Sequence, residues 1–143
     1  MQSQVVAPAR VAITRRATFS ASHRVFRVDW TPDENRRVLG ATSGPRSHGH
    51  NYELEVTLAG PLDPSTGMLV DLKWLKDVIE REVESRFDHR DLNDDTPFFS
   101  DGLATAERLA TVIFELLDRA LPDCLLARVV LRPTEDLEVE VVR

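Results

Sequence analysis

Two stretches in the first half of the chain alternate between apolar and polar residues, which is the pattern of a β-strand with one buried face. In residues 11–21 the odd positions are apolar apart from Arg15, and the even positions are polar from Thr14 onward. In residues 52–58 the even positions are apolar, and the pattern ends where Gly60 precedes a proline. We therefore predict two one-sided strands.

Two later segments place apolar residues at helical spacing. The first covers residues 71–87, where Asp71 is suited to accept hydrogen bonds as an N-cap, and the second begins at Thr105 and ends before Pro122. Each predicted helix therefore has one apolar stripe. The stripes consist of Leu72, Leu75, Val78, Ile79 and Val83 in the first helix and Leu109, Val112, Ile113, Leu116 and Leu117 in the second.

The remaining segments complete an α+β pattern. Residues 126–131 and 137–142 are predicted strands around the turn-like RPTED, and residues 24–47 are a predicted long loop with a short helix after Pro32. The order ββααββ fits a four-stranded antiparallel sheet with two helices on one face. We expect the other sheet face to be solvated or covered by a partner subunit.

Composition narrows the class of protein. The 143 residues, 42% of them hydrophobic, suit a single domain over residues 11–143 after a flexible segment of residues 1–10. The excess of 24 acidic over 18 basic residues argues against a nucleic-acid partner. No apolar run reaches the ~18 residues of a membrane span. A single cysteine and a start without the apolar core of a signal peptide favour a cytoplasmic location.

The four histidines occur in only three short motifs: FSASH at residues 19–23, HGHNY at residues 48–52, and Asp88-His89. Residues two apart on a strand point to the same face with Cα atoms ~6.6 Å apart, so His48 and His50 can converge on one ion. His23 lies on the buried face of the other strand. Three imidazoles with an open fourth position are typical of catalytic zinc, and we predict a Zn²⁺ site.

Judged alone, HGH is as compatible with a turn that carries two solvated histidines, because so short a motif is weak. The third histidine, at the end of a separate strand whose face it shares, favours the metal site.

These motifs, followed by DPSTGMLVDLKWLK, FDHRDLN and a helix that starts TAE, together resemble the 6-pyruvoyl-tetrahydropterin synthase and 6-carboxytetrahydropterin synthase family. The resemblance runs from residue 11 to the C-terminus. It implies the tunnelling fold, in which three subunits join their sheets into a barrel and two rings stack into a homohexamer. Such a dimer of trimers has its active sites at subunit interfaces, and its partner subunits would cover the open sheet face.

The resemblance also implies site roles. His23, His48 and His50 would hold zinc against the side-chain oxygens of a reduced pterin. Asp88 and His89 match a pair that relays protons, although such a pair after a helix is equally compatible with a surface or capping role. At the start of the second helix, Thr105 and Glu107 match residues near the substrate pocket.

Two family residues are replaced. The cysteine that acts as general base corresponds to Thr42, or to Ser43 or Gly44 with a shorter loop, and a hydroxyl is a much weaker base at neutral pH. Cys124 is expected only to pack among apolar neighbours. A glutamate that anchors the pterin ring corresponds to Pro133, and Glu135 would reach that place only through a bulge or register shift.

Three functions follow as hypotheses. The first is a zinc-dependent lyase that acts on a reduced pterin or a related polyhydroxylated heterocycle, with His89 as acid and base, by retro-aldol cleavage of a side chain. The second is a repurposed cyclase, aldolase or isomerase on a non-pterin small molecule, with Arg46 or Arg132 binding an anionic group. Thr42 and Arg46 are further candidate substrate-binding residues. The third is a non-catalytic zinc-binding assembly module.

Overall fold

The computed structural model describes residues 9–41 and 43–143. Thr42 and residues 1–8 of the predicted N-terminal segment lie outside the described residues, and Arg10 already belongs to the first strand. The elements in chain order are β1 (Arg10–His23), α1 (Pro32–Leu39), β2 (His48–Pro61), α2 (Leu72–Ile79), the π-helical η1 (Glu80–Glu84), α3 (Ser85–Phe87), β3 (Arg90–Asp91), α4 (Ala106–Ala120), β4 (Leu126–Thr134) and β5 (Leu137–Val142).

The sheet has five strands in the order β3-β1-β2-β4-β5, so the prediction of four strands is wrong. Four strands pair antiparallel, but β3 pairs parallel to β1 through Ala21↔Arg90 and Ser22↔Asp91. A strand of two residues has no alternation that a sequence pattern can reveal. Backbone hydrogen bonds hold β3 beside β1, and one of them runs from the His89 N–H to the Ser20 carbonyl at 2.6 Å.

Residues 72–87 form one helical run in which the α-helical ladder widens to a π-helical turn over η1. The Asp71 carboxylate accepts from the N–H groups of Lys73 and Trp74, which confirms the predicted N-cap. Leu75 is fully buried, but Leu72 is 56% exposed, so its place in the predicted stripe is wrong. Leu72 is the first helical residue, next to the cap, and burial in this helix begins at Leu75.

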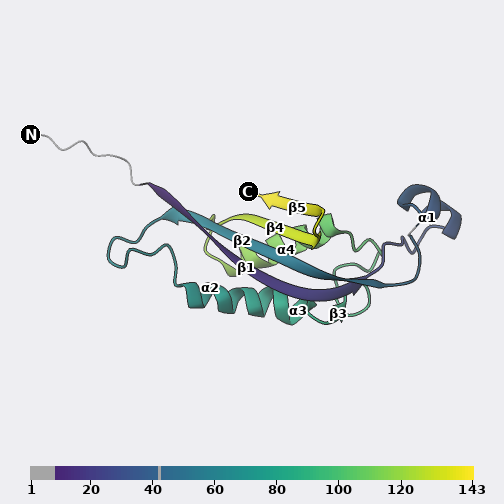
Figure 1. The fold of residues 1–143 in the computed structure, drawn as a ribbon, viewed down its shortest axis with the longest axis horizontal. Coiled ribbons are helices and arrows are strands. Elements are labelled where there is room, and N and C mark those ends of the chain that lie inside the picture. Colours follow the sequence, from purple (N-terminus) through teal and green to yellow (C-terminus); the bar gives the residue numbers. More distant parts are fainter. Residues whose placement is uncertain (1–8, 42) are drawn as a thin grey trace, which may run out of the picture.

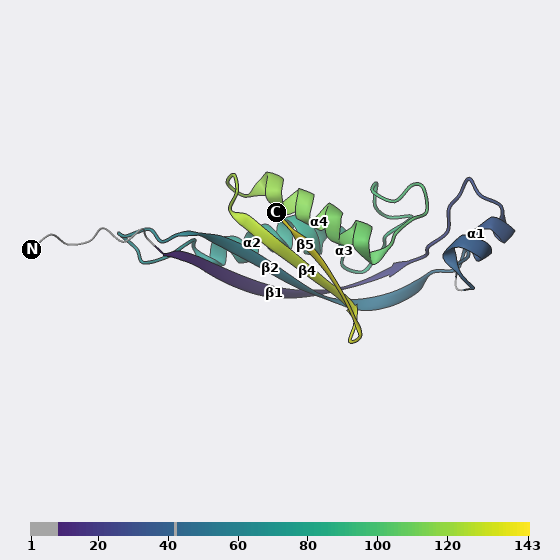
Figure 2. The ribbon, with the colours of Figure 1, turned by 90° about the horizontal axis from the view of Figure 1, so that it is seen from above.

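α2, α3 and α4 pack on one face of the sheet, as predicted, and α1 lies beyond the far ends of β1 and β2 (Figure 2). α4 begins where the Thr105 hydroxyl accepts from the Arg108 N–H, and the short α1 begins in the same way at Thr31. Between helices and sheet lies a single core, which includes Phe19, Tyr52, Leu54, Val56, Leu58, Val83, Phe87, Leu109, Ile113, Leu117 and Leu131. No helix within residues 9–41 and 43–143 is both long and apolar enough to span a bilayer.

The opposite sheet face carries a group of ionic side chains. Glu55 pairs there with Arg16 at 3.1 Å and with Arg132 at 3.0 Å, and Arg132 also reaches Glu138 at 3.6 Å. The hydrogen bond from Arg132 is the main reason why the pKa of Glu55 lies below its usual value, and burial opposes this shift. The charge of Arg132 is therefore already engaged by two carboxylates.

Cys124 does not pack in the interior as expected. It is exposed, in the turn between α4 and β4, with φ of 62°. Its backbone is left-handed, as in tight turns, and Leu126, two residues later, is fully buried.

β1 and β2 extend well beyond the β4–β5 hairpin toward the end of the molecule that carries α1 (Figure 1). Their pairing is continuous from Arg10↔Pro61 to His23↔His48, whereas β4 pairs with β2 only from Glu53 onward. The far ends of these two long strands therefore project beyond β4 and β5, and His23, His48 and His50 lie there.

The contrast between Leu75 and Leu72 gives a test of the packing. Leu75→Ala should lower the free energy of unfolding by about 2–5 kcal/mol, because it leaves a cavity under the helix. Leu72→Ala, in the same helix, should change it by no more than about 0.5 kcal/mol. Chemical denaturation of both variants measures the difference. Equal losses would contradict the assignment of the buried helix face.

Candidate metal site and substrate cavity

The register of β1 and β2 brings three histidines to one face of the sheet. His23 is the last residue of β1 and lies directly opposite His48, the first residue of β2, while His50 lies opposite Ala21. Directly opposed residues and residues two apart share a face. This is the helix-facing side, on which Ala21 and Tyr52 are buried.

The three imidazoles are close enough to bind one ion. One ring nitrogen from each lies within 4.8 Å of the other two, and the Nε2 atoms of His23 and His50 are 3.0 Å apart. Two nitrogens bound to a tetrahedral ion at about 2.0–2.1 Å would lie about 3.3–3.4 Å apart, so a small adjustment suffices. His23, His48 and His50 could therefore hold a metal ion and leave a fourth position open.

A backbone carbonyl fixes the orientation of the His23 ring. The Nδ1 atom of His23 lies 2.6 Å from the carbonyl oxygen of Ala104, which can only accept, so Nδ1 carries the proton and Nε2 has a free lone pair. Such a partner behind a metal-binding imidazole is the usual way in which its ligand nitrogen is oriented. Ala104 was not predicted, because a carbonyl leaves no signal in residue type.

Burial keeps two of the imidazoles neutral, which is the form that binds metal. Burial lowers the pKa of His23, the hydrogen bond to Ala104 partly opposes this, and the neighbouring His48 lowers it further. Burial also lowers the pKa of His50, with added repulsion from His23 and His48. The lowered pKa values favour the neutral form of both rings, in which one ring nitrogen carries a lone pair.

A cavity of about 310 Å³ opens in front of the three rings. Thr105 and Glu107 reach it from the start of α4, and Pro133 and Thr134 reach it from β4. Glu107 is the carboxylate among its described lining residues. The remaining lining residues are Val25, Leu39, Ser43, Ala106 and Leu137, together with the three histidines.

The structure does not place Asp88 and His89 in this cavity. The His89 Nδ1 lies 3.0 Å from Asp88, whose other oxygen accepts the Ser20 N–H at 2.9 Å. The Ser20 bond is the main cause that lowers the pKa of Asp88, while burial opposes it and His89 contributes further. His89 is 84% exposed and lines a separate hollow of about 530 Å³ with Ser20 and Asn51, whose positions belong to the open sheet face.

The other predicted substrate residues are distributed differently. Arg46 is exposed and is absent from the described lining of the cavity, and Thr42 lies outside the described residues. β4 and β5 do shift register between Leu131 and Thr134. Glu135, beyond this irregularity, lines a neighbouring hollow of about 600 Å³ with His50, but it does not line the cavity in front of the three rings.

Comparisons with known proteins identify relatives of this chain. The profile of the family described as 6-pyruvoyl tetrahydropterin synthase matches residues 12–142. The chain is 43% identical over 110 residues to a 6-pyruvoyl tetrahydrobiopterin synthase of Poecilia reticulata, covering 77% of this chain and 75% of that protein. It is 37% identical over 124 residues to the human protein of that name, covering 87% and 86%.

Among solved structures, the fold is similar to Caenorhabditis elegans 6-pyruvoyl tetrahydropterin synthase, with a TM-score of 0.89 and 31% identity over 97% of this chain and 99% of that one.

The histidines offer a matched test of metal binding. The native chain should bind one zinc ion per subunit, and His48→Ala should weaken this binding by at least 100-fold, on the order expected when one of three ligands is lost. His89→Ala removes the one histidine outside the cluster and should leave affinity unchanged. Competition with a chromogenic chelator measures both. Similar losses in the two variants would argue against this ligand set.

Proposed function

We propose, from the membership of this chain in the 6-pyruvoyl tetrahydropterin synthase family, that it is a zinc-dependent lyase acting on a reduced pterin. One observation carries the proposal. The three imidazoles and the Glu107 carboxylate line the same cavity, so metal and ring anchor would face one small molecule.

Zinc fits the donor set better than other common ions. Three neutral nitrogens suit zinc, whereas magnesium and calcium prefer oxygen ligands. Bound zinc would supply Lewis-acid polarisation of the hydroxyl oxygens on the pterin side chain. The chain's own contribution is three closely spaced imidazole nitrogens at the cavity, with the His23 ring fixed by Ala104.

Glu107 is the residue that we assign to the pterin ring. The amino-pyrimidine edge of a pterin offers two parallel N–H donors, which a carboxylate accepts in a paired geometry. Pro133 lines the same cavity but has no such acceptor, and Glu135 lies in the neighbouring hollow. Thr105 adds a hydroxyl beside Glu107. A cavity of about 310 Å³ is at the lower end of small-molecule sites, which suits a bicyclic ring.

The acid/base group is assigned to another copy of the chain. His89 does not line the cavity that holds Glu107 but is exposed in a neighbouring hollow, which His50 also borders. We propose that His89, oriented by Asp88, lies against the cavity of a neighbouring subunit in a homohexamer made of two trimers. The cytoplasmic location stays a prediction.

The reaction that needs the fewest groups is retro-aldol cleavage of the side chain. His89 removes the proton from the 2′ hydroxyl, the bond between the first and second side-chain carbons breaks, and the second carbon becomes an aldehyde. The electron pair passes into the C6=N5 imine of the dihydropterin. The proton held on His89 then returns to the first carbon. This sequence requires one base and no thiol, which matches the absence of cysteine from the described cavity.

The substrate test compares two compounds. Zinc-loaded protein should convert 7,8-dihydroneopterin into a shortened pterin and glycolaldehyde, followed by liquid chromatography. Release of triphosphate from the triphosphate ester would show instead an elimination reaction on the same ring. No product from either compound, with zinc bound, would contradict a pterin substrate and favour the repurposed enzyme.

Glu107→Gln should lower kcat/KM by about 10- to 100-fold, because a charged acceptor of the ring N–H groups is lost. Glu115→Gln is the matched control, since Glu115 is an exposed acid further along α4. It should retain native kinetics. If both variants keep full activity on the accepted pterin, Glu107 does not anchor the ring.

Subunit mixing tests the shared site. His48→Ala and His89→Ala should each be inactive alone, but mixed oligomers should regain a fraction of native activity, because some sites combine an intact metal centre with an intact His89. A mixture of His48→Ala and His50→Ala should stay inactive. Mass spectrometry verifies that mixed oligomers form. Mixed oligomers of the first pair without activity would contradict a site shared between subunits.

A further inference from the structure

The two metal-binding residues that face each other lie at the end of a strand ladder. The antiparallel pairing of β1 and β2 terminates at His23↔His48, and loops follow on one side and precede on the other. Ends of ladders open more easily than their centres. The spacing of these two imidazoles therefore needs a constraint other than the sheet itself.

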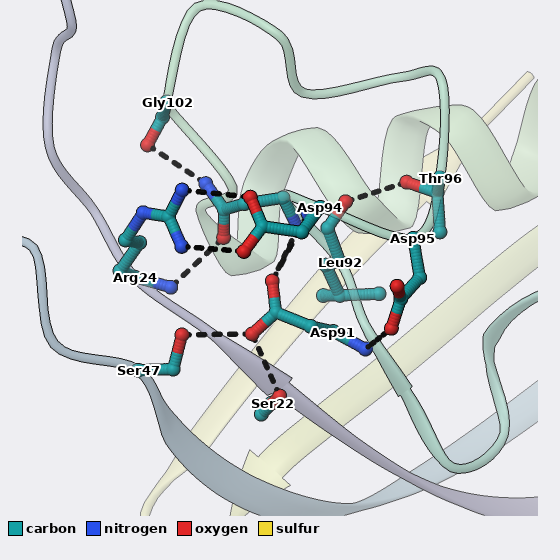
Figure 3. Close-up of polar contacts among 10 residues, drawn as sticks. Ser22, Arg24, Ser47, Asp91, Leu92, Asp94, Asp95, Thr96 and Gly102 are labelled. Carbon is teal, nitrogen blue, oxygen red and sulfur yellow. Dashed lines mark hydrogen bonds and ion pairs between the residues drawn. The ribbon is translucent and has the colours of Figure 1, made fainter.

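One carboxylate provides such a constraint. The Oδ2 atom of Asp91 accepts the Ser22 hydroxyl at 2.8 Å and the Ser47 hydroxyl at 2.7 Å (Figure 3). Ser22 directly precedes His23, and Ser47 directly precedes His48. A single oxygen thus joins the two strands at the residues next to both metal ligands.

Asp91 is itself held firmly. Its Oδ1 atom accepts the N–H groups of Asn93 at 3.1 Å and Asp94 at 3.0 Å, and its own N–H donates to Asp95 at 2.8 Å. Burial opposes ionisation, but the bonds from Ser47, Ser22 and the two amides outweigh it, so the pKa of Asp91 lies below its usual value. Four donors therefore point at one ionised carboxylate.

More hydrogen bonds hold the end of β1, at His23, than hold the start of β2, at His48. On the β1 side the His23 ring is also bonded to Ala104, and the following Arg24 donates its N–H to Asn93 at 2.9 Å. The Arg24 guanidinium also makes two bonds to Asp94, at 3.0 and 2.8 Å. On the β2 side, Ser47 connects the exposed end of the loop to this network. The position of His48 therefore depends most on the Ser47–Asp91 bond.

We infer that Asp91 is a positioning residue, which sets the separation of His23 and His48 through the serines that precede them and thereby sets the metal affinity. The inference rests on the proposed function, since it presupposes that the three histidines bind zinc. Mutation of residues that orient metal ligands commonly weakens metal binding by about 10- to 100-fold. Asp91 does not contact the ligand nitrogens, so its effect is transmitted through the backbone.

The test measures zinc dissociation constants by competition with a chromogenic chelator. Asp91→Ala should weaken binding by about 10- to 100-fold, and Asp91→Asn by less, because the amide keeps one acceptor oxygen. The control is Asp63→Ala, which removes a carboxylate that also accepts a serine hydroxyl (Ser65, 2.6 Å) but lies beyond the other end of β2. It should bind zinc like the native chain.

Substitution of Ser47 and Ser22 distinguishes an effect on ligand position from an effect on the stability of the fold. Ser47→Ala removes one exposed hydroxyl and should weaken zinc binding by about 2- to 10-fold, more than Ser22→Ala does. Adding Ser47→Ala to Asp91→Ala should cause no further loss, because both changes remove the same bond. The visible spectrum of the cobalt-substituted protein should shift in Ser47→Ala, while the melting temperature of the metal-free protein stays at the native value.

Native zinc affinity in both Asp91→Ala and Ser47→Ala would overturn the inference and leave the proposed function intact. An equal loss in Asp63→Ala would overturn it as well, since the effect would then be general. A native chain that binds no zinc would refute the proposed metal site itself, and the role of Asp91 with it.

Discussion

The register between β1 and β2 is the constraint on which both the core and the site depend. Side chains alternate along a strand, so a slip of one residue would turn every side chain of β2 to the other face. The same register stacks Phe19 on Tyr52, with ring centroids 5.0 Å apart, and places His23 opposite His48. The hydrophobic core therefore selects the register that brings the three imidazoles together at one end of the two strands.

The same pairing separates the chemistry of the chain into two parts. The histidine cluster and Glu107 line one cavity, whereas His89, beside Asp88, lines a neighbouring hollow that is bordered by Ser20 and Asn51 and, among the described residues, shares only His50 with the cavity. In an isolated subunit, the metal site and Glu107 would face one cavity, and the His89 imidazole would face the neighbouring hollow. In the proposed assembly, each subunit completes the site of its neighbour, so catalysis would require association as well as folding.

Sequence patterns predicted the helices and strands whose apolar residues repeat at regular spacing, and missed the short β3, which has no such repeat. The alternation in β1 and β2, the caps at Asp71 and Thr105, and the one-sided packing of the helices were all readable from residue type. The two-residue β3 was not, and neither was the exposed turn conformation of Cys124. Ala104 and Asp91 act through tertiary contacts, and contacts between distant segments leave no local signal in a single sequence.

X-ray absorption at the zinc edge of the metal-loaded protein tests the central claim most directly, because it reports the atoms around the ion without reference to activity. The account predicts three imidazole nitrogens at about 2.0–2.1 Å and one further light-atom ligand. A sulfur neighbour at about 2.3 Å would contradict it, since the chain's single cysteine is Cys124, which is not part of the cluster. Fewer than three imidazoles around the ion would contradict it equally.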